Sequence, residues 1–384
     1  MDDVTTHTGD RIVLSGRVIA AVAATYLLMG VLASAYGPLL EHLSHRFAIS
    51  LSVAGGVLSA HFVGALLGVI VSMWTMERVP VRLAATVSVG CLGAGCAGVA
   101  VAPSWPAFLA AASVIGFGFG ALDIGLNQLV AHSEGPRRSG VLNALNGLYG
   151  IGAVAGPILV STFSEKHFAL LYASGAVVAV GLLPSVAGIS GRLPFTPRKP
   201  AGRPSMLVVA FVIAYVLYVA VETGVGGWMT SDLESVGHRS VVAATLTSGF
   251  WAAIALGRLL IALVPQRVPE SAIVITGSAI AAVALAVALV GPAAPFAFIV
   301  TGFAIAPIFP TGIVWLAKLR PGDSLATSWL FPASMVGGAI VPAGIGVVIA
   351  SFGIGWAPAV LSALAIGTLG AFVMANGSRT GRAV

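Results

Sequence analysis

Two acidic residues lie inside long apolar stretches of this chain. Asp123 follows the run Phe117-Gly-Phe-Gly-Ala-Leu, and Glu222 follows Tyr218-Val-Ala-Val. A charged side chain at the centre of a membrane costs at least about 2.5–3.5 kcal/mol on insertion scales, so its presence there points to function. A carboxyl group that takes up a proton on one side of a membrane and releases it on the other couples transport to a proton gradient. We interpret Asp123 and Glu222 as proton-coupling candidates, with a structural carboxylate that pairs with a neighbouring backbone group or an arginine as the alternative.

Amide side chains accompany Asp123 at helical spacing. Asn127 lies one helical turn after Asp123, and Asn143 and Asn146 share one face of the next apolar stretch. Amides both donate and accept hydrogen bonds, which suits the hydroxyl groups of a sugar. We predict substrate contacts for the three asparagines, with hydrogen bonds between helices as the alternative.

Aromatic residues mark the second half of the chain. Tyr218 lies one turn before Glu222, and Trp251 lies in the middle of an apolar run, where its ring could stack on the apolar face of a pyranose. We include both among the substrate-binding candidates, with ordinary packing as the alternative for Trp251. The other six tryptophans lie near the ends of apolar runs and are interpreted as interfacial anchors.

Two further titratable residues interrupt apolar runs. Arg258 follows Gly257 and requires a counter-charge or carbonyl groups, so we assign it to a gate or to structural pairing. His61 lies in the middle of the second run, and its role stays open between a proton relay and a hydrogen-bonded structural histidine.

The composition excludes a soluble protein. Charged residues make up 8% of the 384 residues, and the set AVILMFWYC makes up 58%. A soluble domain carries about 25% charged residues. The mean hydropathy of +1.02 also excludes intrinsic disorder, which requires low hydrophobicity. We predict an all-α polytopic membrane protein embedded in the lipid bilayer.

The residue inventory also disfavours enzymes and channels. Cys91 and Cys96 lie in one apolar run, which argues against a disulfide framework and a cysteine zinc site. The sequence contains no Walker A loop and no cluster with metal-ligand spacing. No repeated selectivity loop is recognisable. We therefore expect no enzymatic activity, no metal and no cofactor.

A membrane-spanning helix needs about 20 mostly apolar residues. Twelve such runs are present, and the loops between them are too short to hold a soluble domain. The predicted spans are 16–40, 51–74, 82–102, 107–131, 140–163, 168–190, 205–230, 240–264, 271–291, 295–317, 324–350 and 354–375.

A basic linker over residues 191–204 divides the chain into six-helix halves at 1–190 and 205–384. With the amino terminus in the cytoplasm, 15 Lys and Arg residues fall on the cytoplasmic side and three fall outside. Because basic loops stay in the cytoplasm, we predict a cytoplasmic-membrane protein with both termini inside. These loops explain the net charge of +6 through anionic headgroups, without nucleic acid.

An internal repeat relates the two halves. Shifting the sequence by 189 positions aligns the second predicted span with the eighth and produces six identities in 22 pairs. About two would be expected from such a biased composition. The matches end in equivalent loops, Glu77-Arg78-Val79-Pro80 and Gln266-Arg267-Val268-Pro269. Parallel six-helix repeats are typical of carriers that rock about a central site.

These features resemble the major facilitator superfamily. The loop with Glu77, Arg78 and Arg82 is similar to that superfamily's signature between spans 2 and 3, although Met73 and Pro80 replace its two glycines. The resemblance implies twelve helices in two pseudo-symmetric halves. It also implies gating or structural roles for Glu77, Arg78 and Arg82, the same class of role that the need for a counter-charge assigns to Arg258.

A narrower resemblance points to the fucose permease and sodium-glucose-transporter-like branch. It rests on the stretches 120–127, 142–150 and 218–228, on Phe250-Trp251 with Gly257-Arg258, and on Ala306-Pro307-Ile-Phe-Pro310. That branch carries sugars with a coupling ion. This chain departs from it in having no acidic residue between Gly16 and Leu40.

We therefore predict a secondary transporter that moves a small hydrophilic solute, a monosaccharide, by proton symport as a monomer. Sodium coupling is an alternative, because carboxylate and amide oxygens can bind a hard cation. Another alternative is a proton-driven antiporter that exports drugs or metabolites. A third is a non-transporting receptor on the same fold.

Overall fold

The computed structural model describes residues 15–75, 78–132, 138–163, 167–189, 205–261, 267–321 and 323–377. Within these ranges every regular element is a helix, and twelve segments are long and apolar enough to cross a membrane. The prediction of twelve spans is confirmed. The linker at 191–204 lies outside the described residues, as does Glu77.

The first group of helices runs from α1 to α7. Span 2 is made of a short helix and a longer one, which meet at Gly55. The bounds are α1 Gly16–Phe47, α2 Leu51–Ala54, α3 Gly56–Thr75, α4 Val81–Val101, α5 Trp105–His132, α6 Arg138–Phe163 and α7 Phe168–Ala187.

The second group runs from α8 to α15, and span 10 changes helix at Ala306-Pro307. Pro307 has no N–H to donate to the preceding turn, which accounts for the break. The bounds are α8 Met206–Ser235, α9 Ser240–Leu260, α10 Glu270–Val287, η2 Gly291–Ala293, α11 Ala294–Ile305, α12 Ile308–Leu319, α13 Ser324–Ser328, α14 Leu330–Phe352, η3 Ile354–Trp356 and α15 Ala357–Gly377.

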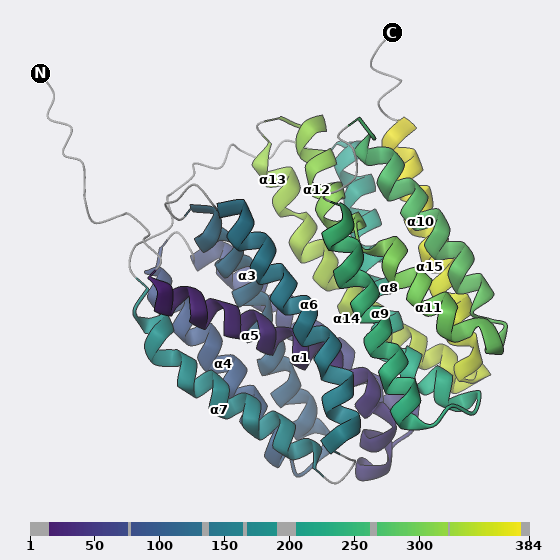
Figure 1. Ribbon diagram of the computed structural model, residues 1–384, viewed down its shortest axis with the longest axis horizontal. Helices are drawn as coiled ribbons and strands as arrows, with labels where there is room; N and C mark the ends of the chain where they lie inside the picture. The colour runs from purple at the N-terminus through teal and green to yellow at the C-terminus, as the bar shows by residue number, and fades with distance from the viewer. Residues whose placement is uncertain are drawn as a thin grey trace, which may run out of the picture.

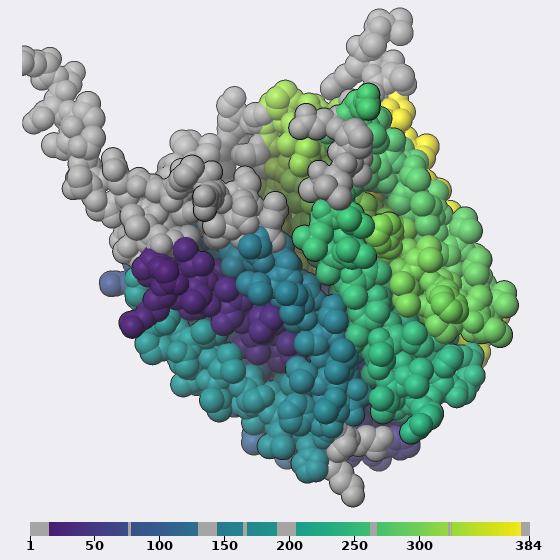
Figure 2. Space-filling view, in the orientation of Figure 1, coloured from purple at the N-terminus to yellow at the C-terminus, as the bar shows by residue number. Residues whose placement is uncertain are grey.

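The two groups lie side by side (Figure 1). Helices α3 and α14 pack across the boundary, as do α1 and α8, and α6 and α9. On the face seen in Figure 2, α6 and α9 are adjacent where the groups meet. A site near this boundary therefore draws its side chains from both groups.

The two groups of helices approach each other most closely at the C-terminal parts of α1, α8 and α14. A Cβ atom on Gly37 would lie 2.3 Å from the carbonyl oxygen of Gly226, and one on Gly346 would lie 2.8 Å from that of Ser52. Trp228 fills the space above Gly55. We call this region, defined by Gly37, Ser52, Gly55, Gly226 and Gly346, the closed end.

Alanine at Gly37 should weaken this contact, because backbone carbonyls cannot move aside as a flexible side chain can. The measurement uses a cysteine placed at Ser52 in a background without native cysteines. We expect this cysteine to react several-fold faster with a soluble maleimide when Gly37→Ala is present than when position 37 is glycine. Gly344→Ala is the control, because a Cβ there meets nothing within 4 Å. Equal labelling of both variants would contradict the assignment of Gly37 to the closed end.

Two tryptophans correct the expectation of interfacial anchors. Trp228 and Trp315 are 0% and 1% exposed, whereas Trp74, Trp329 and Trp356 are more than half exposed. Trp315 packs edge-on against Phe211, with ring centroids 4.9 Å apart, and Trp228 packs in the closed end. Position along a span did not reveal that these rings point into the bundle.

Candidate functional site

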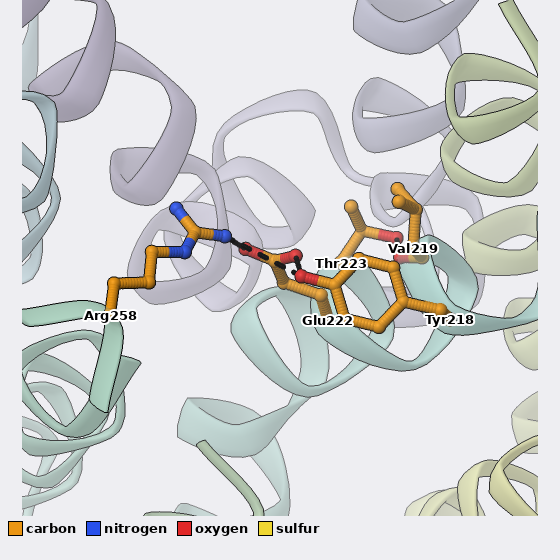
Figure 3. A network of polar contacts seen from close by, with 5 residues as sticks. All are labelled: Tyr218, Val219, Glu222, Thr223 and Arg258. Atoms are coloured by element: carbon orange, nitrogen blue, oxygen red, sulfur yellow. Dashed lines mark hydrogen bonds and ion pairs between the residues drawn. The ribbon is translucent and has the colours of Figure 1, made fainter. Parts of the chain in front are cut away.

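A polar network links α8 to α9 in the interior of the second group (Figure 3). Nη2 of Arg258 lies 3.1 Å from Oε1 of Glu222 and 3.4 Å from the hydroxyl oxygen of Tyr218. The Tyr218 hydroxyl donates to Oε2 of Glu222. The side chains of Glu222 and Arg258 are 13% and 28% exposed. Both acceptor oxygens of Glu222 are thus engaged by groups of its own half.

Local sequence positions these three side chains. Tyr218 and Glu222 are four residues apart, so they share one face of α8. Arg258 lies in the last turn of α9, where a cation also complements the helix dipole. The preceding Gly257 packs against Ala306, and a Cβ there would lie 2.6 Å from the Ala306 methyl group. This close approach faces Gly257 toward α11 and leaves Arg258 directed at α8.

Asp123 faces this network from the first group of helices. The Nδ2 atom of Asn127 donates to the backbone oxygen of Asp123 at 2.6 Å and lies 3.3 Å from Oδ1. Both residues are half-buried. Asp123 interacts electrostatically with Arg258 across the boundary and with Tyr26 of α1. Glu222 therefore forms an ion pair with Arg258 in direct contact, whereas Asp123 interacts with Arg258 over a longer distance.

Tyr149 of α6 connects the two sides. It interacts electrostatically with Glu222, Arg258 and Asp123. The backbone of Tyr149 touches Gly30 of α1, and the next residue, Gly150, packs on α9. We name Tyr26, Asp123, Tyr149, Glu222 and Arg258, with Tyr218, the central cluster.

The remaining substrate-binding candidates lie at different depths. Asn146 is exposed and lies one turn before Tyr149 on α6. Trp251 is 7% exposed and packs against Gly226, one turn beyond Glu222 on α8. Its Nε1 has no hydrogen-bond partner within the described ranges. Asn143 falls in α6, but its side chain lies outside what the structure describes.

The signature-like loop lies away from this cluster. Glu77 is outside the described residues, and Arg78 and Arg82 are exposed. Nη1 of Arg78 donates to the backbone oxygen of Trp74 at 3.1 Å. Of the four gating candidates, the structure thus places Arg258 with the proton-coupling candidates.

His61 is buried in the first group, 1% exposed, with Nδ1 3.4 Å from the Tyr36 hydroxyl. The rings of Phe62 and Phe119 lie edge-on against it. In the part of the chain that the structure describes, no three His, Cys, Asp or Glu residues come together as a metal site.

Residues 22–293 match the family described as Major Facilitator Superfamily, which is more than half of the chain. The chain belongs to the Major Facilitator Superfamily. The fold, with twelve spans and a polar cluster between two groups of helices, agrees with this family of transporters. The narrower placement in the fucose permease branch remains a prediction. No curated protein sequence matches the chain.

Solved structures of other transporters share this fold. The D-xylose–proton symporter is 14% identical and superposes with a TM-score of 0.76, over 93% of this chain and 96% of that one. The peptide transporter POT in complex with sulfate is 13% identical, with a TM-score of 0.75 over 94% and 96%. A mutant of the nucleoside transporter NupG is 14% identical, with a TM-score of 0.72 over 93% and 99%. At these identities the similarity concerns the fold alone.

Sequence reasoning missed Tyr26 of the central cluster and one buried acid, and it assigned no role to Tyr149, which lies one step beyond Asn143 and Asn146 at helical spacing. Asp232 is 4% exposed near the end of α8, two residues beyond the predicted span. The signal for Asp232 was present, because residues 228–232 contain no Gly or Pro that would end the helix before this acid. Tyr26 is identified only by the position of α1 beside Asp123.

Proposed function

We propose that this transporter moves a small hydrophilic solute together with a proton, and that Asp123 carries the proton. The observation that supports this is the unequal pairing of the two central acids. Glu222 contacts Arg258, while Asp123 accepts from the amide of Asn127 and has no cation in contact among the described residues. An uncompensated charge is costly inside a membrane. Proton uptake by Asp123 removes that cost.

The cluster's formal charge suggests how coupling works. With both acids ionised, Asp123, Glu222 and Arg258 sum to −1, and one proton makes the cluster neutral. A neutral cluster can pass through an occluded intermediate at lower cost than a charged one. The empty deprotonated carrier keeps its net charge of −1 and would need a second route to neutrality, or hydration, to return. We propose that the solute binds between the two groups and that they rock about it.

The solute class follows from the groups around the cluster. The amides of Asn127 and Asn146 and the hydroxyl of Tyr149 offer donors and acceptors that suit a hydroxylated solute such as a monosaccharide. The ring of Trp251, which packs one turn beyond Glu222, is the candidate for stacking on the apolar face of this solute. With the amino terminus in the cytoplasm, as the basic loops favour, the closed end faces outward.

Uptake into proteoliposomes tests this proposal. We expect at least one labelled solute from a sugar panel to accumulate several-fold when an inward proton gradient is imposed, and the accumulation to collapse with a protonophore. A sodium gradient replaces the proton gradient in the parallel arm. Gradient-driven movement of cationic dyes without solute flux would instead support the export of drugs. Binding without any flux would identify a receptor.

A further inference from the structure

Arg258 has hydrogen-bond donors that the protein does not use. A guanidinium carries five N–H groups. Nη2 serves Glu222 and Tyr218, whereas Nε is buried without an acceptor within the described residues, and Nη1 has no bond to any of them. Figure 3 shows the ion pair at one nitrogen and the others directed away from Glu222. Leaving a buried charged donor without a hydrogen bond costs free energy. We therefore expect a ligand to supply the acceptor for these N–H groups.

The placement of these donors fits a ligand group. The Arg258 side chain is 28% exposed, although α9 is packed on both α6 and α8. Across the boundary lie Asp123 and Tyr149, both within electrostatic range of the guanidinium. Arginine binds carboxylates and phosphates through charge-assisted hydrogen bonds, and Nη1 alone offers two N–H groups that a ligand can use without displacing Glu222 from Nη2.

We propose that the substrate is a hydroxylated monocarboxylate, a sugar acid, and that its carboxylate binds Arg258. This inference rests on the proposed symport function and names its substrate class. The hydroxyl groups of the solute would then meet the amides of Asn127 and Asn146. Glu222 keeps Arg258 in place from one side, and the solute occupies the free side.

Charge arithmetic connects such a substrate to the proton. The ionised cluster carries −1, and a bound monoanion brings the total to −2. A second negative charge near Asp123 favours its protonated form, because like charges at close range oppose ionisation. Anion binding and proton uptake therefore assist each other. One anion and one proton together carry no net charge, so the loaded cluster has the same net charge of −1 as the empty deprotonated one, and a complete transport cycle is electroneutral.

Electroneutrality separates this inference from symport of a neutral sugar. Labelled D-gluconate, D-galactonate and D-glucuronate are compared with D-glucose, D-galactose and L-fucose in proteoliposomes, with a pH gradient and a potassium–valinomycin potential imposed separately. We expect an acid to accumulate with the pH gradient and to ignore the membrane potential. Accumulation of a neutral sugar that responds to both gradients would overturn the inference and leave the proposed function intact. No gradient-driven flux of any solute would overturn both.

Variants test whether Arg258 binds the solute or only neutralises Glu222. In Arg258→Gln, the half-saturation concentration for the accumulated acid should rise roughly 10- to 100-fold. Glu222→Gln/Arg258→Gln removes both charges, so a purely structural pair would regain normal uptake in the double variant. We expect the double variant to keep the raised value. Recovery to within two-fold of the wild type would overturn the inference.

Arg320→Gln supplies the matched control. Arg320 also pairs with a carboxylate, Asp323, at 3.0 Å, but at the end of α12 and outside the central cluster. The half-saturation concentration of Arg320→Gln should equal that of the wild type. A comparable rise in this control would show that losing any such pair impairs uptake, and would remove the support for a carboxylate site at Arg258.

Discussion

Asparagine at position 123 should abolish gradient-driven accumulation and leave exchange of labelled for unlabelled solute largely intact. The amide resembles the protonated acid in shape and charge, so the loaded carrier still changes conformation. It cannot release a proton, and the gradient therefore no longer drives net uptake. With an inward gradient of one pH unit, we expect accumulation to fall about tenfold while the exchange rate stays within about threefold, because one coupled proton sustains about a tenfold concentration ratio.

Two further variants control this result. Glu270→Gln removes a carboxylate that pairs with Lys318 outside the cluster and should leave accumulation unchanged. Asp123→Glu keeps an ionisable group and should retain part of the accumulation. Normal accumulation in Asp123→Asn would remove Asp123 from the coupling mechanism.

Arg258→Gln should destabilise the folded protein more than the double variant Glu222→Gln/Arg258→Gln. The single change leaves the Glu222 carboxylate in the interior without its cation, and removing one partner of a buried ion pair costs about 3–5 kcal/mol. Cavity hydration lowers the cost here, because Arg258 is 28% exposed. The double variant leaves no uncompensated charge and should recover most of the loss.

Thermal unfolding in detergent measures this difference. The midpoint for Arg258→Gln should lie several degrees below that of the wild type, with the double variant between them and nearer the wild type. Equal midpoints for all three proteins would mean that the ion pair contributes nothing to folding. Stability and substrate affinity are then read separately, because the double variant is expected to regain the first and not the second.

Much of the fold was predictable from hydropathy. In a bilayer each backbone group needs an internal partner, so an apolar run of sufficient length must be a helix. The ends were less predictable. Span 7 was expected to stop at residue 230, whereas α8 continues to Ser235. Span 10 was expected as one run, whereas α11 and α12 meet at Ala306-Pro307.

The site was predictable as a set of residues and not as a set of contacts. Asp123, Glu222 and Arg258 stand out because charge in an apolar run is rare. The pairing of Glu222 with Arg258, 36 residues apart, depends on how α8 and α9 are rotated against one another. No sequence pattern in either helix predicts that relative rotation. The same limitation concealed the neighbours of Tyr149, which follow from the packing of α6 on α1 and α9.

Proton movement during solute uptake tests the central claim most directly. Proteoliposomes are loaded with a fluorescent pH indicator, and the solute that the wild type accumulates is added with no initial pH gradient. We predict internal acidification with one proton entering per solute in the wild type, and none in Asp123→Asn. Solute entry without acidification, or equal acidification in both proteins, would contradict it.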